Sequence, residues 1–164
     1  MPRVLLLALA LLLGACAGHT PVPRESPPLV AQLPLSLQIE RQQAGTRQDW
    51  LLVLQAEGET LRWSLFDPLG VPLARQLLHG GEWRNDGLLP PHAEARELFA
   101  ALLFALVADE ALQAYPAGSW QRGADGQRRL NPHWRIRYRG ALDFTLAAPD
   151  LSYRVRALNQ EEGD

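Results

Sequence analysis

Apolar and polar residues alternate with a period of two along much of the chain, as in β-strands that bury one face. Five segments show this alternation: residues 35–40, 60–65, 134–139, 142–146 and 153–156. Their apolar positions are Leu35, Leu37, Ile39, Leu61, Trp63, Leu65, Trp134, Ile136, Tyr138, Leu142, Phe144, Leu146, Tyr153 and Val155. Residues 50–54 are apolar on both faces, so we expect that strand to be central in a sheet or covered.

Short turns separate the early strands. They contain Glu57-Gly58-Glu59, then Asp67-Pro68-Leu69-Gly70, then Gly80-Gly81. Glycine, proline and aspartate favour tight turns, and links this short join antiparallel neighbours. The pattern therefore predicts an antiparallel meander.

One helix is expected between the two groups of strands. Pro90-Pro91 stop the preceding segment, Glu94 and Glu97 suit a first helical turn, and residues 98–108 are an unbroken apolar run. A helix that is apolar on all sides has to be covered on both sides.

Asp109 is expected to cap a short second helix that reaches Leu112. The order of strands, helices and further strands predicts an α+β fold that is mainly β. We expect one antiparallel sheet, curled into an unclosed β-barrel with a helical lid, because strands alone would fill the core of a sandwich.

The N-terminus has the features of a secretory signal. Arg3 precedes the apolar residues 4–15, a stretch shorter than the about 20 apolar residues that a membrane span requires. Cys16, the only cysteine, follows Leu13-Gly14-Ala15, and this tetrapeptide resembles the lipobox of bacterial lipoproteins. The resemblance implies that Cys16 is acylated and becomes the mature N-terminus, anchored by more than one acyl chain. The alternative is a small apolar residue at an ordinary cleavage site.

This interpretation divides the chain into four parts. Residues 1–15 are the signal peptide, 16–33 a lipidated cysteine with a proline-rich tether, 34–158 the folded domain, and 159–164 an acidic tail. At about 3.1 Å per residue, the tether would hold the domain up to roughly 50 Å from the bilayer. The resemblance implies a bacterial source, and Ala17 in place of aspartate favours the periplasmic face of the outer membrane.

The composition and the motifs of the chain argue against several classes of function. The 16 basic residues are all arginine and are outnumbered by 18 acidic ones, so the net charge of −2 gives no overall attraction to nucleic acid. The four histidines are scattered, and no nucleophile elbow, zinc-binding helix or phosphate loop is present. We therefore expect no catalytic residues, no metal and no cofactor, and keep a periplasmic hydrolase only as a third hypothesis.

Residues 61–74 resemble a family of known function. The sequence Leu-Arg-Trp-Ser-Leu-Phe-Asp-Pro-Leu-Gly, followed by Val-Pro-Leu-Ala, is similar to the strand–turn–strand of the LolA/LolB lipoprotein-localisation factors, in which the LolB hairpin presents an exposed leucine. The chain more closely resembles an uncharacterised family of bacterial outer-membrane lipoproteins, which share the Asp-Pro-Leu-Gly turn and the segment Gln127-Arg128-Arg129-Leu130. Some of these are encoded beside genes for aryl polyene, a fatty-acid-like pigment. The resemblance implies an unclosed barrel that encloses a cavity for acyl chains.

Three groups of side chains are candidate sites. Leu69, at the third position of its turn, either points into solvent as a membrane or cargo contact or folds back onto Leu73 or Phe66. The cavity and lid candidates, which are equally explained as solid core, are Phe99, Leu102, Leu103, Phe104, Leu106, Trp63, Trp134 and Tyr138.

The third group is a set of arginines. Arg135, Arg137 and Arg139 share one face of a strand, and Arg154 and Arg156 repeat the pattern on an expected neighbouring strand. Such a set is commonly a solvated face. The alternative is attraction to anionic lipid head groups or to an acidic partner.

Together these features predict an outer-membrane-anchored periplasmic lipoprotein that binds or transfers acyl chains or another hydrophobic cargo, such as a lipoprotein, a lipid or a polyene ester. Its expected partners are the membrane, through Cys16, the cargo and a periplasmic carrier protein, and we expect a monomer that binds no nucleic acid. The alternative is a non-catalytic accessory subunit of an envelope assembly.

Overall fold

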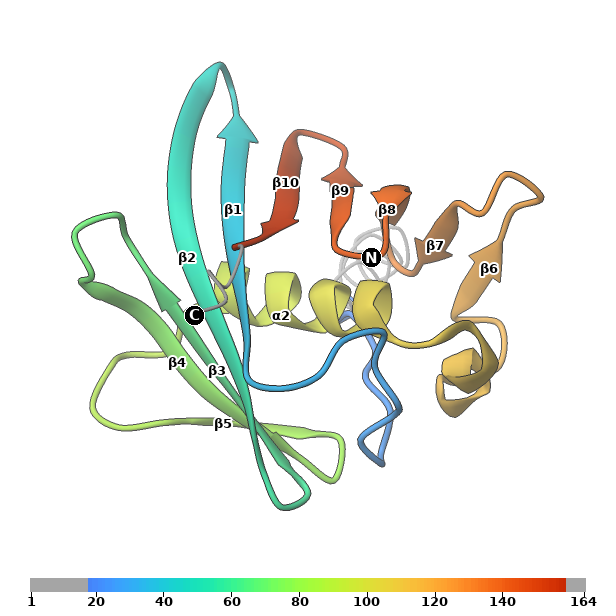
Figure 1. Cartoon of the computed structure of the whole chain (residues 1–164), viewed down its shortest axis with the longest axis horizontal. Helices are drawn as coiled ribbons and strands as arrows, with labels where there is room; N and C mark the ends of the chain where they lie inside the picture. Colours follow the sequence, from blue (N-terminus) through green and yellow to red (C-terminus); the bar gives the residue numbers. More distant parts are fainter. Residues whose placement is uncertain (1–17, 159–164) are drawn as a thin grey trace, which may run out of the picture.

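Residues 18–158 form one ten-stranded antiparallel sheet wrapped around a helix (Figure 1). The computed structural model describes residues 18–158, so Cys16 and the expected acidic tail lie outside the described residues. The elements are β1 (Leu35–Gln43), β2 (Thr46–Glu57), β3 (Thr60–Phe66), β4 (Pro72–His79), β5 (Glu82–Asn85), α2 (Ala93–Leu106), the 3₁₀ helix η1 (Asp109–Ala114), β6 (Trp120–Arg122), β7 (Arg128–Leu130), β8 (Trp134–Gly140), β9 (Asp143–Ala148) and β10 (Leu151–Ala157).

Two five-stranded meanders form the sheet. β1–β5 make one and β6–β10 make the other, and they join where β1 pairs with β10, giving the order β5-β4-β3-β2-β1-β10-β9-β8-β7-β6. At this junction Ile39 faces Trp50 on one side and Val155 on the other. The sheet ends at β5 and β6, so the expected unclosed, mainly β antiparallel fold is confirmed.

Helix α2 lies along the inside of the curled sheet (Figure 1). Every side chain from Leu98 to Val107 is buried, in agreement with the unbroken apolar sequence of this segment. The helix begins where the Nδ1 atom of His92 accepts a hydrogen bond from the Ala95 amide at 3.1 Å. This cap satisfies one of the amide groups that a helix start leaves without a partner.

Residues 18–33, here called the strap, cover part of α2 that the sheet does not reach. The amide of Val30 donates to the Leu106 carbonyl at 2.8 Å, and the amide of Ala108 donates to the Pro28 carbonyl at 3.0 Å. At the other end of the strap, the side chain of Thr20 is buried and accepts a 2.8 Å hydrogen bond from the indole of Trp134. We expected this segment to be a tether, but it packs against the domain, because an all-apolar helix needs a cover on its second side.

The second helix also differs from the expectation. η1 starts at Asp109, but its cap residue is Ala108 and makes no side-chain hydrogen bond. The Asp109 carboxylate instead pairs with Arg122 and Arg128, at 2.8 and 2.6 Å. Asp109 therefore forms ion pairs with arginines of β6 and β7 instead of capping η1.

Candidate functional site

The side chains expected to line a cavity or form a lid lie mostly in the packed interior. Phe99, Leu102, Leu103, Phe104, Leu106, Trp63 and Trp134 are all buried in one hydrophobic cluster. Trp63 stacks on Phe99 with ring centroids 5.4 Å apart, and Phe104 meets Tyr115 edge to face at 4.9 Å. For these residues the contacts favour the core alternative, since α2 fills the space inside the sheet.

A groove opens at the C-terminal end of α2, and Tyr138 is the one predicted cavity residue that lines it. The groove has a volume of about 630 Å³. We call it the end groove; its lining residues are Leu29, Val30, Ala105, Ala108, Asp109, Glu110, Arg122, Gly126, Arg128, Tyr138, Gly140 and Ala141. Its apolar residues come from the strap, the C-terminal end of α2 with the following Ala108, and β8 with the following turn, and its four charged residues come from η1, β6 and β7.

Arg128 organises the charged side of the end groove. Its side chain is only 6% exposed, and Nη1 donates to the carbonyls of Phe104 and Val107, both at 2.8 Å. These carbonyls belong to the C-terminal end of α2, where backbone acceptors lack helical partners and a cation is favourable. Nη2 donates to Asp109 at 2.6 Å, so the buried guanidinium has its charge balanced.

Tyr138 lines the end groove beside Arg128. Its hydroxyl donates to the Ala105 carbonyl at 2.9 Å, and its ring lies 5.4 Å from the Arg128 guanidinium carbon. Burial raises the pKa of Tyr138 to about 12, although the charge of Arg128 opposes this shift. The hydroxyl therefore stays protonated near neutral pH and acts as a hydrogen-bond donor rather than as a base.

The sequence contained a signal for Arg128 that we did not use. Arg128 precedes Leu130 by two residues, and side chains two apart on a strand share a face. Because Leu130 is buried, Arg128 had to point inward as well. The partners of Arg128 come from α2 and η1, and only the folded structure reveals them.

Leu69 points into solvent, with 89% of its surface exposed. The turn is held by Asp67, whose carboxylate accepts hydrogen bonds from the amides of Leu69 and Val71 at 2.9 and 2.8 Å. This arrangement leaves the Leu69 side chain at the tip of the hairpin, away from Phe66 and Leu73. The position of the side chain agrees with the first of the two alternatives for this residue.

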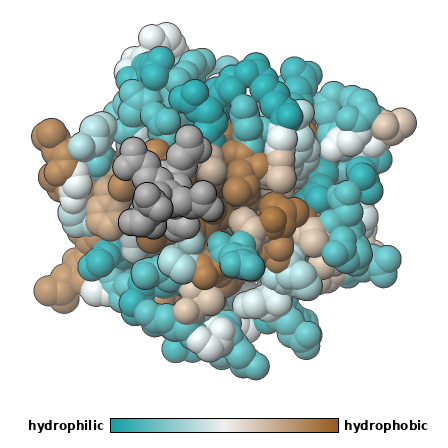
Figure 2. Space-filling model, in the orientation of Figure 1, coloured by the Kyte–Doolittle hydropathy of each residue, from teal (hydrophilic) through white to brown (hydrophobic). Residues whose placement is uncertain are grey.

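A second apolar tip was not anticipated. Leu88, in the loop between β5 and α2, is fully exposed. In Figure 2 apolar side chains project at the left edge of the molecule, where Figure 1 places both this loop and the β3–β4 hairpin. The available sequence signal was the pair Leu88-Leu89 between a glycine and two prolines in an otherwise polar loop.

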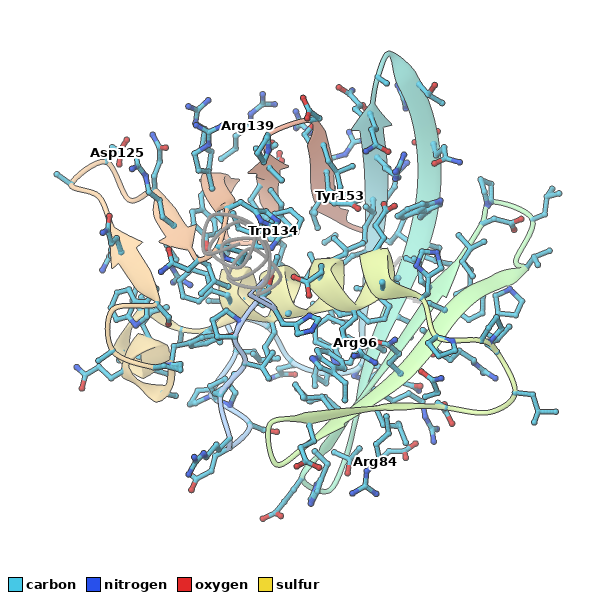
Figure 3. All side chains as sticks on the ribbon, turned by 180° about the vertical axis from the view of Figure 1, so that it is seen from behind. Arg84, Arg96, Asp125, Trp134, Arg139 and Tyr153 are labelled. Atoms are coloured by element: carbon cyan, nitrogen blue, oxygen red, sulfur yellow. The ribbon has the colours of Figure 1, made fainter. Side chains whose placement is uncertain are left out.

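The predicted arginines lie on the outer face of the sheet. Arg135, Arg137 and Arg139 alternate with the inward-facing Trp134, Ile136 and Tyr138 on β8. Arg154 and Arg156 are on β10, which is not the neighbour of β8, because β9 pairs with both strands. Arg139 and Trp134 mark opposite ends of β8 in Figure 3.

Three of the four histidines have hydrogen-bonding neighbours in the described structure. His92 caps α2, His79 lies 3.3 Å from the Thr60 hydroxyl, and His19 lies 3.4 Å from Glu97. Among residues 18–158 no three or more His, Cys, Asp or Glu side chains are placed to hold a metal ion. Nor does any helix in this described part combine the length and apolar character needed to cross a membrane.

Neither the protein-family models nor the curated proteins contain a match to this chain. The end groove, the two exposed leucine tips and the outer arginines are therefore interpreted from their own chemistry.

Proposed function

We propose that this protein is an outer-membrane-anchored periplasmic lipoprotein that binds or transfers acyl chains or another hydrophobic cargo without catalysing a reaction. The main support for the proposal is the end groove, which is lined by apolar residues and by charged residues. Such amphipathic sites suit ligands with a long apolar part and a polar head. The lipobox-like sequence at Cys16 supports the membrane location.

The two walls of the end groove suggest how such a cargo would be held. An acyl chain would lie against Leu29, Val30, Ala105 and Ala108. Each buried methylene contributes about 0.8 kcal/mol, so a chain of moderate length needs no covalent chemistry to bind. Arg122 is about half exposed and, besides its 2.8 Å pair with Asp109, has donors left for a carboxylate or phosphate on the cargo, whereas Arg128 is buried among its protein partners.

The exposed leucines support a role at an apolar boundary. Leu69 and Leu88 project from two loops that lie on the same side of the molecule (Figures 1 and 2). The likeness of residues 61–74 to the LolA/LolB hairpin adds to this proposal. We propose that these tips contact the membrane or the cargo during transfer.

A fluorescent fatty-acid probe tests cargo binding. Wild-type protein is expected to bind the probe, and Ala108→Trp is expected to weaken binding at least about tenfold by filling the end groove, a difference of about 1.4 kcal/mol. Ala147→Trp, on the outer face of β9, is the matched control and should bind normally. No binding to wild type, or equal binding by Ala108→Trp, would contradict the proposal.

One observation favours the alternative of a structural accessory subunit. The interior of the sheet is filled by α2, so the fold can act as a rigid docking module without any ligand. Mass spectrometry of material extracted from the purified protein distinguishes the two functions. Recovered lipid supports cargo binding, and a lipid-free protein with a stable envelope partner supports the accessory role.

A further inference from the structure

We propose that the outer face of β7–β10 docks on the phosphate head groups of an anionic phospholipid membrane. This deepens the function proposed above, because it rests on the same membrane location and adds the surface that meets the bilayer. We call this surface the basic face and define it by Arg129, Arg135, Arg137, Arg139, Arg154 and Arg156.

The basic face has an excess of positive charge in a protein whose net charge is −2. Asp143 is the acidic side chain on the outer face of these strands, and it is paired with Arg154 at 3.1 Å. Within residues 18–158 no carboxylate lies within 4.0 Å of Arg129, Arg135, Arg137 or Arg139. Arg137 donates one hydrogen bond to the Gln127 side chain at 3.3 Å and keeps its other donors, so all four guanidinium groups can still bind an external anion.

The strand register brings like charges together. Arg129 and Arg135 are directly opposite each other on β7 and β8. Like charges at directly opposed positions destabilise a sheet. The presence of these two arginines is therefore not explained by a contribution to folding. On the next row, Arg137 and Arg154 flank Thr145 of β9 and extend the positive charge across three strands.

The shape of the basic face favours a membrane over a small ligand. Its arginines project from the outer side of one sheet. Adjacent strands are about 4.8 Å apart and alternate residues along one strand are about 7 Å apart, so the arginines form a two-dimensional array. Guanidinium groups pair bidentately with phosphate oxygens. An array of this kind can contact many head groups at once.

The strap places the expected acylation site near the start of β8. Thr20 is bonded to Trp134, the first residue of β8, and Cys16 precedes Thr20 by four residues. Four extended residues span at most about 14 Å. An acyl anchor at Cys16 would therefore hold Thr20 within that distance of the bilayer, one side-chain contact away from the start of β8, the strand with three of the arginines.

Vesicle binding tests the proposal. The full chain with Cys16→Ser, which cannot be acylated at that position, is mixed with vesicles of pure phosphatidylcholine or of phosphatidylcholine containing phosphatidylglycerol. Binding to the anionic vesicles is expected to be stronger and to weaken as salt is added. The variants compared below share the same N-terminal residues, so a difference between them does not come from that segment.

Arg135→Glu/Arg139→Glu is the decisive variant, because neither side chain forms a hydrogen bond or ion pair with another described residue. Each arginine near an anionic surface strengthens binding about fivefold, so the double reversal should weaken it by at least about 25-fold. Arg75→Glu/Arg84→Glu, on β4 and β5 at the other end of the sheet, is the matched control with the same change in net charge. Thermal unfolding checks that both variants fold.

The two double variants distinguish binding through the basic face from binding through net charge. Loss of binding confined to the β8 variant supports the proposal, and Arg135→Gln/Arg139→Gln should then show an intermediate loss. Equal loss in the control would attribute binding to net charge alone and overturn the proposal, as would equal binding to both kinds of vesicle. Binding of an acidic protein without binding to anionic vesicles would also overturn it. The fatty-acid probe measured on the same variants reports separately on cargo binding.

Discussion

The hydroxyl of Tyr153 donates a 2.5 Å hydrogen bond to the carboxylate of Glu94 and so joins the last strand of the sheet to the first turn of α2. The same carboxylate accepts two hydrogen bonds from Arg41 of β1, at 2.5 and 3.0 Å. Burial and the hydrogen bond to Glu94 both raise the pKa of Tyr153, so its hydroxyl stays protonated. The N-terminal end of α2 is thus attached where the two meanders meet.

Tyr153→Phe should lower the free energy of unfolding by about 1–2 kcal/mol, because it removes one donor from a charged acceptor while preserving the ring. Urea unfolding measures the change. Tyr115→Phe is the matched control, since the Tyr115 hydroxyl is buried and has no hydrogen-bond partner in the described structure. Removing that hydroxyl should leave stability unchanged or raise it, and equal destabilisation by both variants would contradict the prediction.

Stability should fall in acid in a way that depends on Glu94. Burial raises the pKa of Glu94, but the hydrogen bonds from Arg41 and Tyr153 outweigh it and lower the pKa below its ordinary value of 4.5. A lowered pKa means that the stabilisation is present above the unfolded-state pKa and is lost as the pH falls through the folded-state value. Glu94→Gln should therefore be less stable than wild type at about pH 6, and the difference should shrink towards about pH 3. A difference that does not change with pH would refute this assignment.

Leu69→Glu should leave folding nearly unchanged, because substitutions at an exposed turn alter stability by about 0.5 kcal/mol or less. It should, however, impair complementation of a deletion strain, since burying a leucine at a membrane or cargo contact contributes about 1.5–3 kcal/mol. Leu69→Ser separates the loss of the apolar tip from the added charge. Full complementation by both folded variants would exclude a role for the tip in transfer.

Arg128→Lys should destabilise the protein by about 1.5–3 kcal/mol, because a single ammonium group cannot replace the forked contacts to Phe104, Val107 and Asp109. Arg129→Lys is the adjacent control on the outer face and should be neutral. Chemical unfolding of the pair gives the comparison. Equal stability of the two variants would mean that the helix end does not depend on the guanidinium.

Cys16→Ser should move the protein from the membrane fraction to a soluble or unprocessed form, because the serine hydroxyl does not take the thiol's place in lipidation. Cell fractionation with Ala17→Ser as the control measures this. A Cys16→Ser variant that still fractionates with the outer membrane would disprove anchoring through this residue.

Local patterns in the sequence were sufficient for α2, for the strands β1, β2, β3, β8, β9 and β10, and for one exposed site. The alternation around Leu37, Trp63 and Ile136 predicted strands that bury these side chains, because successive residues of a strand face opposite sides. The unbroken apolar run after Glu97, preceded by two prolines and by acidic residues suited to a first helical turn, predicted α2. The Asp67 turn placed Leu69 at a tip, since a four-residue turn is determined by its own residues.

Only the tertiary structure decided how these elements close around one another. The pairing of β1 with β10, the packing of the strap through Thr20 and the contacts of Arg128 all join residues far apart in the chain, and no short-range pattern records such pairs. The same holds for the interior: Trp63 and Phe99 were equally suited to line a cavity or to fill it. Their stacking at 5.4 Å follows from the distance between α2 and the sheet, which depends on the side chains of all the elements packed between them.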